Sequence, residues 1–93
     1  MPKFSRQYPG KSADEIFARV DETMARMAEK HSLDYEKDEA GKTGAVKKMG
    51  IAGVYAVKDG EVTVDLKFPM LVPGPMKRTV EEAIQKRLDH LFA

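Results

Sequence analysis

The stretch IAGVYAVKDGEVTVDLKF, residues 51–68, contains two alternating runs that flank Asp59-Gly60. An Asp-Gly pair in this setting predicts a hairpin with a two-residue turn of type I′, because that turn needs positive φ at both central residues. Counting outward from the turn places Lys58 opposite Glu61 and fixes every later pair. The stretch therefore predicts an antiparallel hairpin with a defined register.

The register gives this hairpin one strongly apolar face. The side chains on that face are Ile51, Tyr55, Val57, Val62, Val64, Leu66 and Phe68. Ile51 and Phe68 form the last expected pair at the open end. Thr63, Asp65 and Lys67 lie on the other face. We expect other elements to cover the apolar face, while water covers most of the other.

The composition narrows the class of protein. The chain has 93 residues, enough for a single domain with one core. With 16 basic and 15 acidic residues the net charge is +1, so the strong positive footprint of a nucleic-acid-binding domain is absent. There is no cysteine, which excludes disulfides and thiolate chemistry and fits a reducing compartment. No run approaches the roughly 18 apolar residues of a membrane span, and the N-terminus lacks a signal-peptide core. We expect a soluble, cytoplasmic protein.

Two helices are predicted, one before and one after the strands in the sequence. Ser12 and Glu15 have the spacing of a capping box, so the first helix begins there. Its apolar arc comprises Ala13, Ile16, Phe17, Val20, Met24, Met27, Ala28 and His31. The second helix begins either with Pro75 in its first turn or with Thr79 capped by Glu82. Its stripe comprises Met76, Val80, Ala83, Ile84, Leu88 and Leu91.

The remaining segments predict further strands. Residues 33–38 alternate weakly and 43–49 form a second candidate strand. Gly50 marks either a turn or a bulge, so residues 43–58 are two strands or one bent strand. Residues 1–11 form an extended N-terminal arm, which Phe4 and Tyr8 would anchor if it were an edge strand.

The predicted fold class is α+β. Its order is a helix, an antiparallel meander of three to four strands and a helix, with both helices on one face of the sheet. Residues 12–93 form a single α+β domain that follows the arm at 1–11. An uncovered sheet edge invites pairing with a second copy, so we expect a homodimer.

Four short motifs resemble those of a small bacterial family, the polyhydroxyalkanoic acid system proteins. They are Gly50-Ile51-Ala52-Gly53, the Asp59-Gly60 hairpin, Leu71-Val72-Pro73, and the closing VEEAI and KRLD segments at 80–84 and 86–89. The resemblance covers roughly residues 11–91. It implies an association with polyhydroxyalkanoate storage granules and transfers no catalytic residue. A tyrosine and tryptophan pair that is frequent in the family is represented here by Tyr35, with Lys37 in place of the tryptophan.

No catalytic, metal or cofactor site emerges from the remaining residues. His31 and His90 lie near the ends of different helices, where a histidine commonly complements the helix dipole, and no nucleophile motif surrounds them. The carboxylates at 34–39 lack the spacing of a calcium loop. We therefore expect a protein that is not an enzyme and carries no cofactor.

Two residues are candidates for ligand contact. Arg87 falls within the apolar stripe of the second helix, where its stem covers the core edge or its guanidinium binds an anion. Tyr55, on the apolar hairpin face, is either a core aromatic with a satisfied hydroxyl or a polar contact for a ligand.

The connector after the hairpin is the candidate for partner binding. Met70, Leu71 and Val72 lie between prolines, and three large apolar side chains in a loop either pack inward or form an adhesive surface. Lys77 and Arg78 flank them and would suit an acidic partner.

These observations leave two main functions. The first is a non-enzymatic accessory or interaction module that contacts a granule surface or a granule-associated protein through residues 69–76 or an open sheet edge. The alternative is a small-ligand-binding domain or enzyme subunit with a pocket between the helices and the sheet, lined by Tyr55 and Arg87. Nucleic acid binding ranks last, because the open sheet face carries no aromatic stacking platform.

Overall fold

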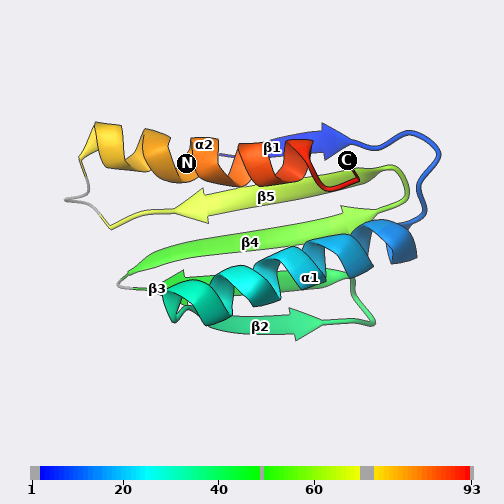
Figure 1. The fold of residues 1–93 in the computed structure, drawn as a ribbon, viewed down its shortest axis with the longest axis horizontal. Coiled ribbons are helices and arrows are strands. Elements are labelled where there is room, and N and C mark those ends of the chain that lie inside the picture. Colours follow the sequence, from blue (N-terminus) through cyan, green and yellow to red (C-terminus); the bar gives the residue numbers. More distant parts are fainter. Residues whose placement is uncertain (1–2, 49, 70–72, 93) are drawn as a thin grey trace.

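A computed structural model describes residues 3–48, 50–69 and 73–92, which fold into two helices and a five-stranded antiparallel sheet (Figure 1). The elements in chain order are β1 (Lys3–Gln7), α1 (Ala13–His31), β2 (Asp34–Asp38), β3 (Thr43–Lys48), β4 (Ile51–Lys58), β5 (Glu61–Lys67) and α2 (Gly74–Asp89). The predicted α+β class is confirmed. The sheet has five strands, whereas the sequence predicted three to four.

The additional strand is β1. The sheet order is β1-β5-β4-β3-β2, in which β2 to β5 are the predicted meander and β1 pairs with β5, Phe4 opposite Val64. Part of the expected arm at 1–11 is therefore an edge strand, which was the alternative to a simple extended arm. Sequence alone did not decide whether these residues form a strand, because the strand with which they pair is distant along the chain.

Residues 43–58 were expected to form either two strands or one strand bent at Gly50, and the structure decides between the two. Lys48 lies opposite Ile51 in an antiparallel pair, and Gly50 has a φ of +83°. Residues 43–58 are thus two strands joined by a turn, and the interpretation as one bent strand is wrong.

The β4–β5 hairpin has the predicted register, with Lys58 opposite Glu61. The pairing ends at Ala52 opposite Lys67, so the predicted pair of Ile51 with Phe68 is absent from the ladder. Pro69 follows this point in the chain, and proline has no amide hydrogen to continue the bonding.

The turn of the hairpin is not the predicted type I′. Gly60 has a φ of +75°, and Asp59 does not share the positive φ, a pattern that matches type II. Other parts of the chain hold the turn. The Gly60 N–H donates to the Lys11 carbonyl at 2.9 Å, and the Gly60 carbonyl accepts from the Tyr8 N–H at 2.8 Å. Asp59 Oδ1 accepts from the Ala13 N–H at 2.8 Å. Rules for isolated hairpins do not include these bonds.

Both helices begin where one of the predicted signals places them. Ser12 is the N-cap of α1, and its Oγ accepts from the Glu15 N–H at 3.2 Å. α2 begins at Gly74 with Pro75 in its first turn, which confirms the first of the two predicted starts.

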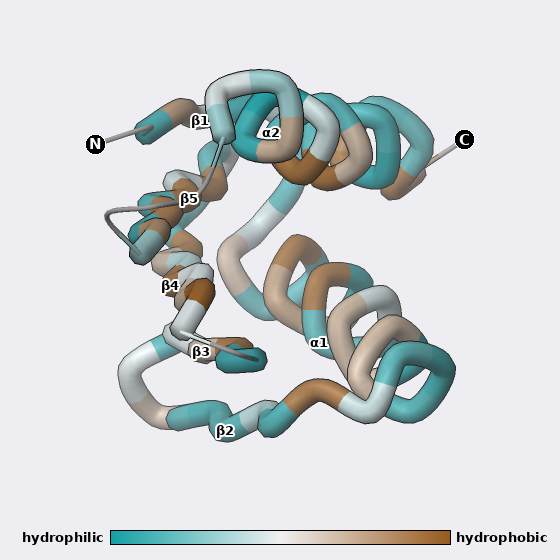
Figure 2. The backbone as a smooth tube through the Cα atoms, turned by 90° about the vertical axis from the view of Figure 1, so that its left-hand side faces the viewer, coloured by the Kyte–Doolittle hydropathy of each residue, from teal (hydrophilic) through white to brown (hydrophobic). Residues whose placement is uncertain are grey.

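Both helices pack on the same face of the sheet, α1 over the β2–β4 side and α2 over the β1–β5 side (Figure 2). The buried core between them and the sheet consists of Ile16, Phe17, Val20, Met24, Tyr55, Val57, Val62, Val64, Leu66, Ile84, Leu88 and Leu91. The predicted apolar hairpin face therefore faces the helices. No helix within the described ranges has the length and apolarity to cross a membrane.

The two outer strands of the sheet are β1 and β2. β2 carries Asp34, Glu36, Lys37 and Asp38, charged residues of the kind that discourage pairing between edge strands. The homodimer thus stays a prediction, with β1 as the better edge for pairing with a second copy.

Light scattering over a concentration series should show a mass that rises toward that of two chains. A monomer mass maintained to high micromolar concentration would contradict it.

We predict that Gly60→Val lowers the free energy of unfolding by on the order of 1 kcal/mol or more, because a β-branched residue resists positive φ. A Cβ at this position would lie 3.9 Å from the Tyr8 carbonyl oxygen, an ordinary contact, so the cost reflects backbone strain. Ala56→Val, which introduces the same side chain at an exposed position of β4, is the control. Denaturant midpoints of both variants measure the difference, and equal midpoints would refute the role of φ.

Candidate binding site between the helices

The two helices are fastened to opposite edges of the sheet. On the β2 side, Tyr35 Oη donates to Asp21 Oδ1 of α1 at 2.8 Å, and Lys37 Nζ lies 2.8 Å from Asp21 Oδ2. These bonds hold the middle of α1 above β2.

On the β1 side, Tyr8 Oη donates to the Leu88 carbonyl of α2 at 2.6 Å, and Arg6 Nη1 lies 2.8 Å from Asp89 Oδ1. Because β1 and β2 are opposite edges, these contacts hold α2 and α1 apart above the middle strands. The space between the helices contains two hollows, each lined by residues of both helices.

The first hollow, here called the apolar hollow, has a volume of about 350 Å³. It lies between the C-terminal half of α1, the middle of α2 and the strands beneath them. Its apolar lining includes Met27, Leu33, Ile51, Leu66, Val80 and Ile84. Its volume is within the range of pockets that hold small molecules.

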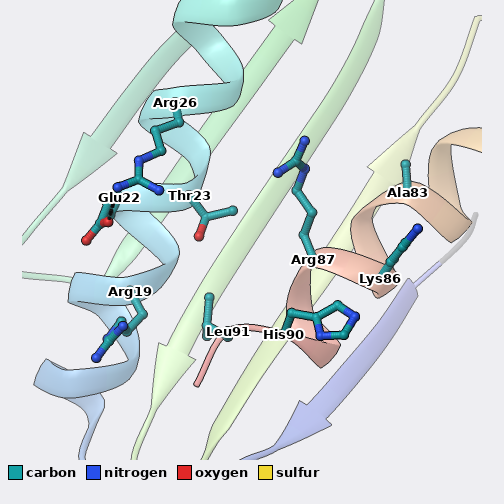
Figure 3. Close-up of a pocket in the computed structure, with 9 residues that line it drawn as sticks. All are labelled: Arg19, Glu22, Thr23, Arg26, Ala83, Lys86, Arg87, His90 and Leu91. Carbon is teal, nitrogen blue, oxygen red and sulfur yellow. Dashed lines mark ion pairs between the residues drawn. The ribbon is translucent and has the colours of Figure 1, made fainter. Parts of the chain in front are cut away.

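The second hollow, here called the basic hollow, has a volume of about 500 Å³ and is lined from both helices (Figure 3). Its cationic residues are Arg19 and Arg26 from α1 and Lys86 and Arg87 from α2. Glu22 is the one carboxylate among its described lining residues, and it pairs with Arg26 at 2.7 Å. Figure 3 shows that Arg87 extends into the space between the helices. The hollow therefore has an excess of positive charge.

The two hollows meet at Ala83, which lines both of them. Val80 and Ile84 line the apolar hollow, and Arg87 lines the basic hollow, within two turns of the same helix. The small side chain of Ala83 thus lies where the lining contributed by α2 changes from mainly apolar to cationic.

Tyr55 belongs to the core and not to this site. It is 4% exposed, and its hydroxyl shares a hydrogen bond of 2.6 Å with the Tyr35 hydroxyl. Its ring covers Gly44 so closely that a Cβ at that glycine would collide with the ring. The structure therefore does not bring Tyr55 and Arg87 together: Arg87 lines the basic hollow, whereas Tyr55 lines neither the basic nor the apolar hollow.

The contacts among Tyr35, Tyr55 and Asp21 also shift the pKa values of these three groups. Burial, together with hydrogen bonds to Tyr55 and Asp21, raises the pKa of Tyr35 far above its ordinary value of 10.0. Burial also raises the pKa of Tyr55. Burial acts to raise the pKa of Asp21 as well, but hydrogen bonds from Lys37 and Tyr35 outweigh it, and the pKa of that carboxyl is lowered.

Of the predicted partner-binding residues, the structure describes Lys77 and Arg78. Met70, Leu71 and Val72 are outside the described residues. Lys77 places its Nζ 5.9 Å from the centre of the Phe68 ring, and Arg78 is exposed on α2. Neither cation is among the described residues that line the hollows.

The histidines lie at helix ends, as predicted, and each also lines a hollow. His31 ends α1 beside the apolar hollow, and His90 caps α2 beside the basic hollow. The described residues include no group of His, Asp and Glu side chains placed to hold a metal ion.

Sequence reasoning missed Arg19, Arg26 and Lys86 as site residues. Both arginines lie outside the apolar arc that helical periodicity predicts for α1, and for an isolated helix this means a position facing solvent. No local signal reveals that this face borders α2 across a space.

A family model described as "Putative polyhydroxyalkanoic acid system protein" matches residues 7–92. No curated protein and no solved structure matches the chain.

We predict that Tyr35→Phe lowers the free energy of unfolding by about 1 kcal/mol at pH 7, because Asp21 and Tyr55 each lose a hydrogen-bond partner.

The raised pKa values of Tyr35 and Tyr55 also predict that the free energy of unfolding depends on pH. The unfolded chain releases tyrosine protons near the ordinary pKa, before the folded chain does, so this stabilisation is complete below pH 10 and declines above it. Denaturant unfolding between pH 8 and 11.5 should show a shallower decline in Tyr35→Phe. Parallel curves for the two proteins would contradict the assignment.

Proposed function

The chain belongs to the polyhydroxyalkanoic acid system protein family, and we propose that it is a non-enzymatic accessory module of polyhydroxyalkanoate systems that binds apolar acyl or polyester chains between its helices. The observation that carries this proposal is the apolar hollow of about 350 Å³ between α1, α2 and the sheet. This proposal combines the granule association that the family name suggests with a defined place of contact.

The chemistry of the apolar hollow suits a polyester of hydroxy acids, whose bulk is hydrocarbon. Met27, Ile51 and Val80 contribute apolar surface from three different elements. Each methylene transferred from water to such a surface contributes roughly 0.8 kcal/mol. The favourable free energy therefore grows with the number of methylenes buried, and this favours a chain of several carbons over a small polar molecule.

The proposal that the module is not an enzyme rests on the side chains that line the two hollows. Thr79 donates its hydroxyl hydrogen to the Pro75 carbonyl at 2.9 Å, so it is engaged with the backbone of its own helix. Within the described part of the chain, no hydrogen bond joins Thr23 or Thr79 to a histidine or a carboxylate. A nucleophile and its base would need such a contact.

A second place of contact is the connector at 70–72. Met76, in the first turns of α2, is 52% exposed and follows this connector closely in the chain. An exposed methionine beside the apolar connector favours an interaction surface there. Binding through the connector and binding through the apolar hollow predict opposite effects for variants in the two places.

We predict that Ile51→Asn reduces binding to purified polyhydroxyalkanoate granules roughly tenfold, because a polar side chain in the apolar hollow removes on the order of 1.4 kcal/mol of apolar contact. Val54→Asn is the matched control, since Val54 lies on the same strand with its side chain on the opposite, exposed face. Co-sedimentation of each variant with granules gives the bound fraction, and thermal midpoints confirm that both variants fold.

Leu71→Ser completes this experiment. Binding through the apolar hollow predicts that Leu71→Ser binds like the unmodified protein. Loss of binding in Leu71→Ser together with normal binding in Ile51→Asn would show that the protein binds through the connector and not through the apolar hollow. Equal binding by Ile51→Asn and Val54→Asn would contradict the role of the apolar hollow.

A further inference from the structure

We propose that the natural ligand is a free carboxylic acid with a single hydrocarbon chain, whose chain lies in the apolar hollow and whose carboxylate is bound in the basic hollow by Arg87. This inference rests on the proposed function and names the chemical class of the ligand. It follows from the position of the two hollows, which adjoin at Ala83.

The charge around the basic hollow favours an anion. Among its described lining residues, four are cationic, Arg19, Arg26, Lys86 and Arg87, and one is a carboxylate, Glu22. The whole chain has a net charge of only +1, so this excess is local. Asp89 of α2, the acidic group next along the helix, is already engaged, since it pairs with Arg6 of β1 at 2.8 Å.

Arg87 is the cation best placed to bind the carboxylate. Arg26 is paired with Glu22, and the Arg19 guanidinium lies 5.6 Å from the centre of the Phe92 ring. Arg87 has no ion pair within the described ranges and extends between the helices (Figure 3). A guanidinium presents two parallel N–H donors, which match the two oxygens of a carboxylate.

The spacing of the two hollows sets the size of the ligand. Val80 and Arg87 are seven positions apart on α2, and a rise of 1.5 Å per residue separates them by about 10 Å along the helix axis. A medium-length acyl chain can therefore place its carboxylate beside Arg87 while its tail lies beside Val80. A neutral ester of the same acid would fill the apolar hollow and leave Arg87 without an anion.

The test compares octanoate with methyl octanoate, which differ in the charge of the head group. Isothermal titration calorimetry at low ionic strength, below the micelle concentration of either compound, gives both affinities. We expect octanoate to bind at least tenfold more tightly than methyl octanoate. We also expect Arg87→Gln to remove most of that preference while leaving the affinity for methyl octanoate unchanged.

Arg78→Gln is the matched control, because Arg78 is an exposed arginine on the same helix that lines neither hollow. Its preference for octanoate should equal that of the unmodified protein. An equal loss of preference in Arg78→Gln and Arg87→Gln would show general charge attraction and overturn the assigned site.

Two further outcomes separate this inference from the function on which it rests. Equal affinities of the unmodified protein for octanoate and methyl octanoate would overturn the carboxylate site and leave binding in the apolar hollow intact. If neither compound binds, and Ile51→Asn also binds granules normally, both the ligand class and the proposed function are wrong.

Discussion

The tip of the β4–β5 hairpin is the point on which the rest of the structure depends. Backbone bonds join Gly60 to Tyr8 and Lys11, and the Asp59 carboxylate accepts from the first amide of α1. One turn therefore sets where β1 leaves the sheet and where α1 begins. It also satisfies an amide that the start of a helix would otherwise leave without a partner. A short turn thus determines how elements distant in sequence are arranged.

The arrangement of the helices follows from how each is attached. Asp21 ties α1 to β2. Asp89 ties α2 to β1, and Leu88 ties it to Tyr8, just after that strand. Polar contacts at the two outer strands hold each helix near its own edge, and the apolar side chains of the core fill the space directly beneath. What remains above the middle strands is an opening whose sides are helix faces. Its chemistry is then decided by which residues those faces carry.

That chemistry changes along the opening, from aliphatic beside Val80 to cationic beside Arg87. Such a gradient suits a molecule that is itself divided into an apolar and an anionic part. Desolvated hydrocarbon supplies most of the binding free energy in a site of this kind, and the guanidinium adds selectivity for the head group. In the function proposed above, this gradient would let the protein sense or carry chain components of the polyester.

The sequence by itself determined the elements with local signals. The Asp59-Gly60 turn, the Ser12 cap and the alternation of residues 51–68 predicted the hairpin register, the start of α1 and the buried sheet face. It also identified Arg87 as a break in an apolar stripe. The tertiary structure alone decided that β1 joins β5, that the buried Tyr55 shares a hydrogen bond with Tyr35, and that Arg19, Arg26 and Arg87 line one hollow. The reason is physical: periodicity reports which face of an element is apolar, whereas the distance between two faces depends on contacts made by residues far apart in the chain.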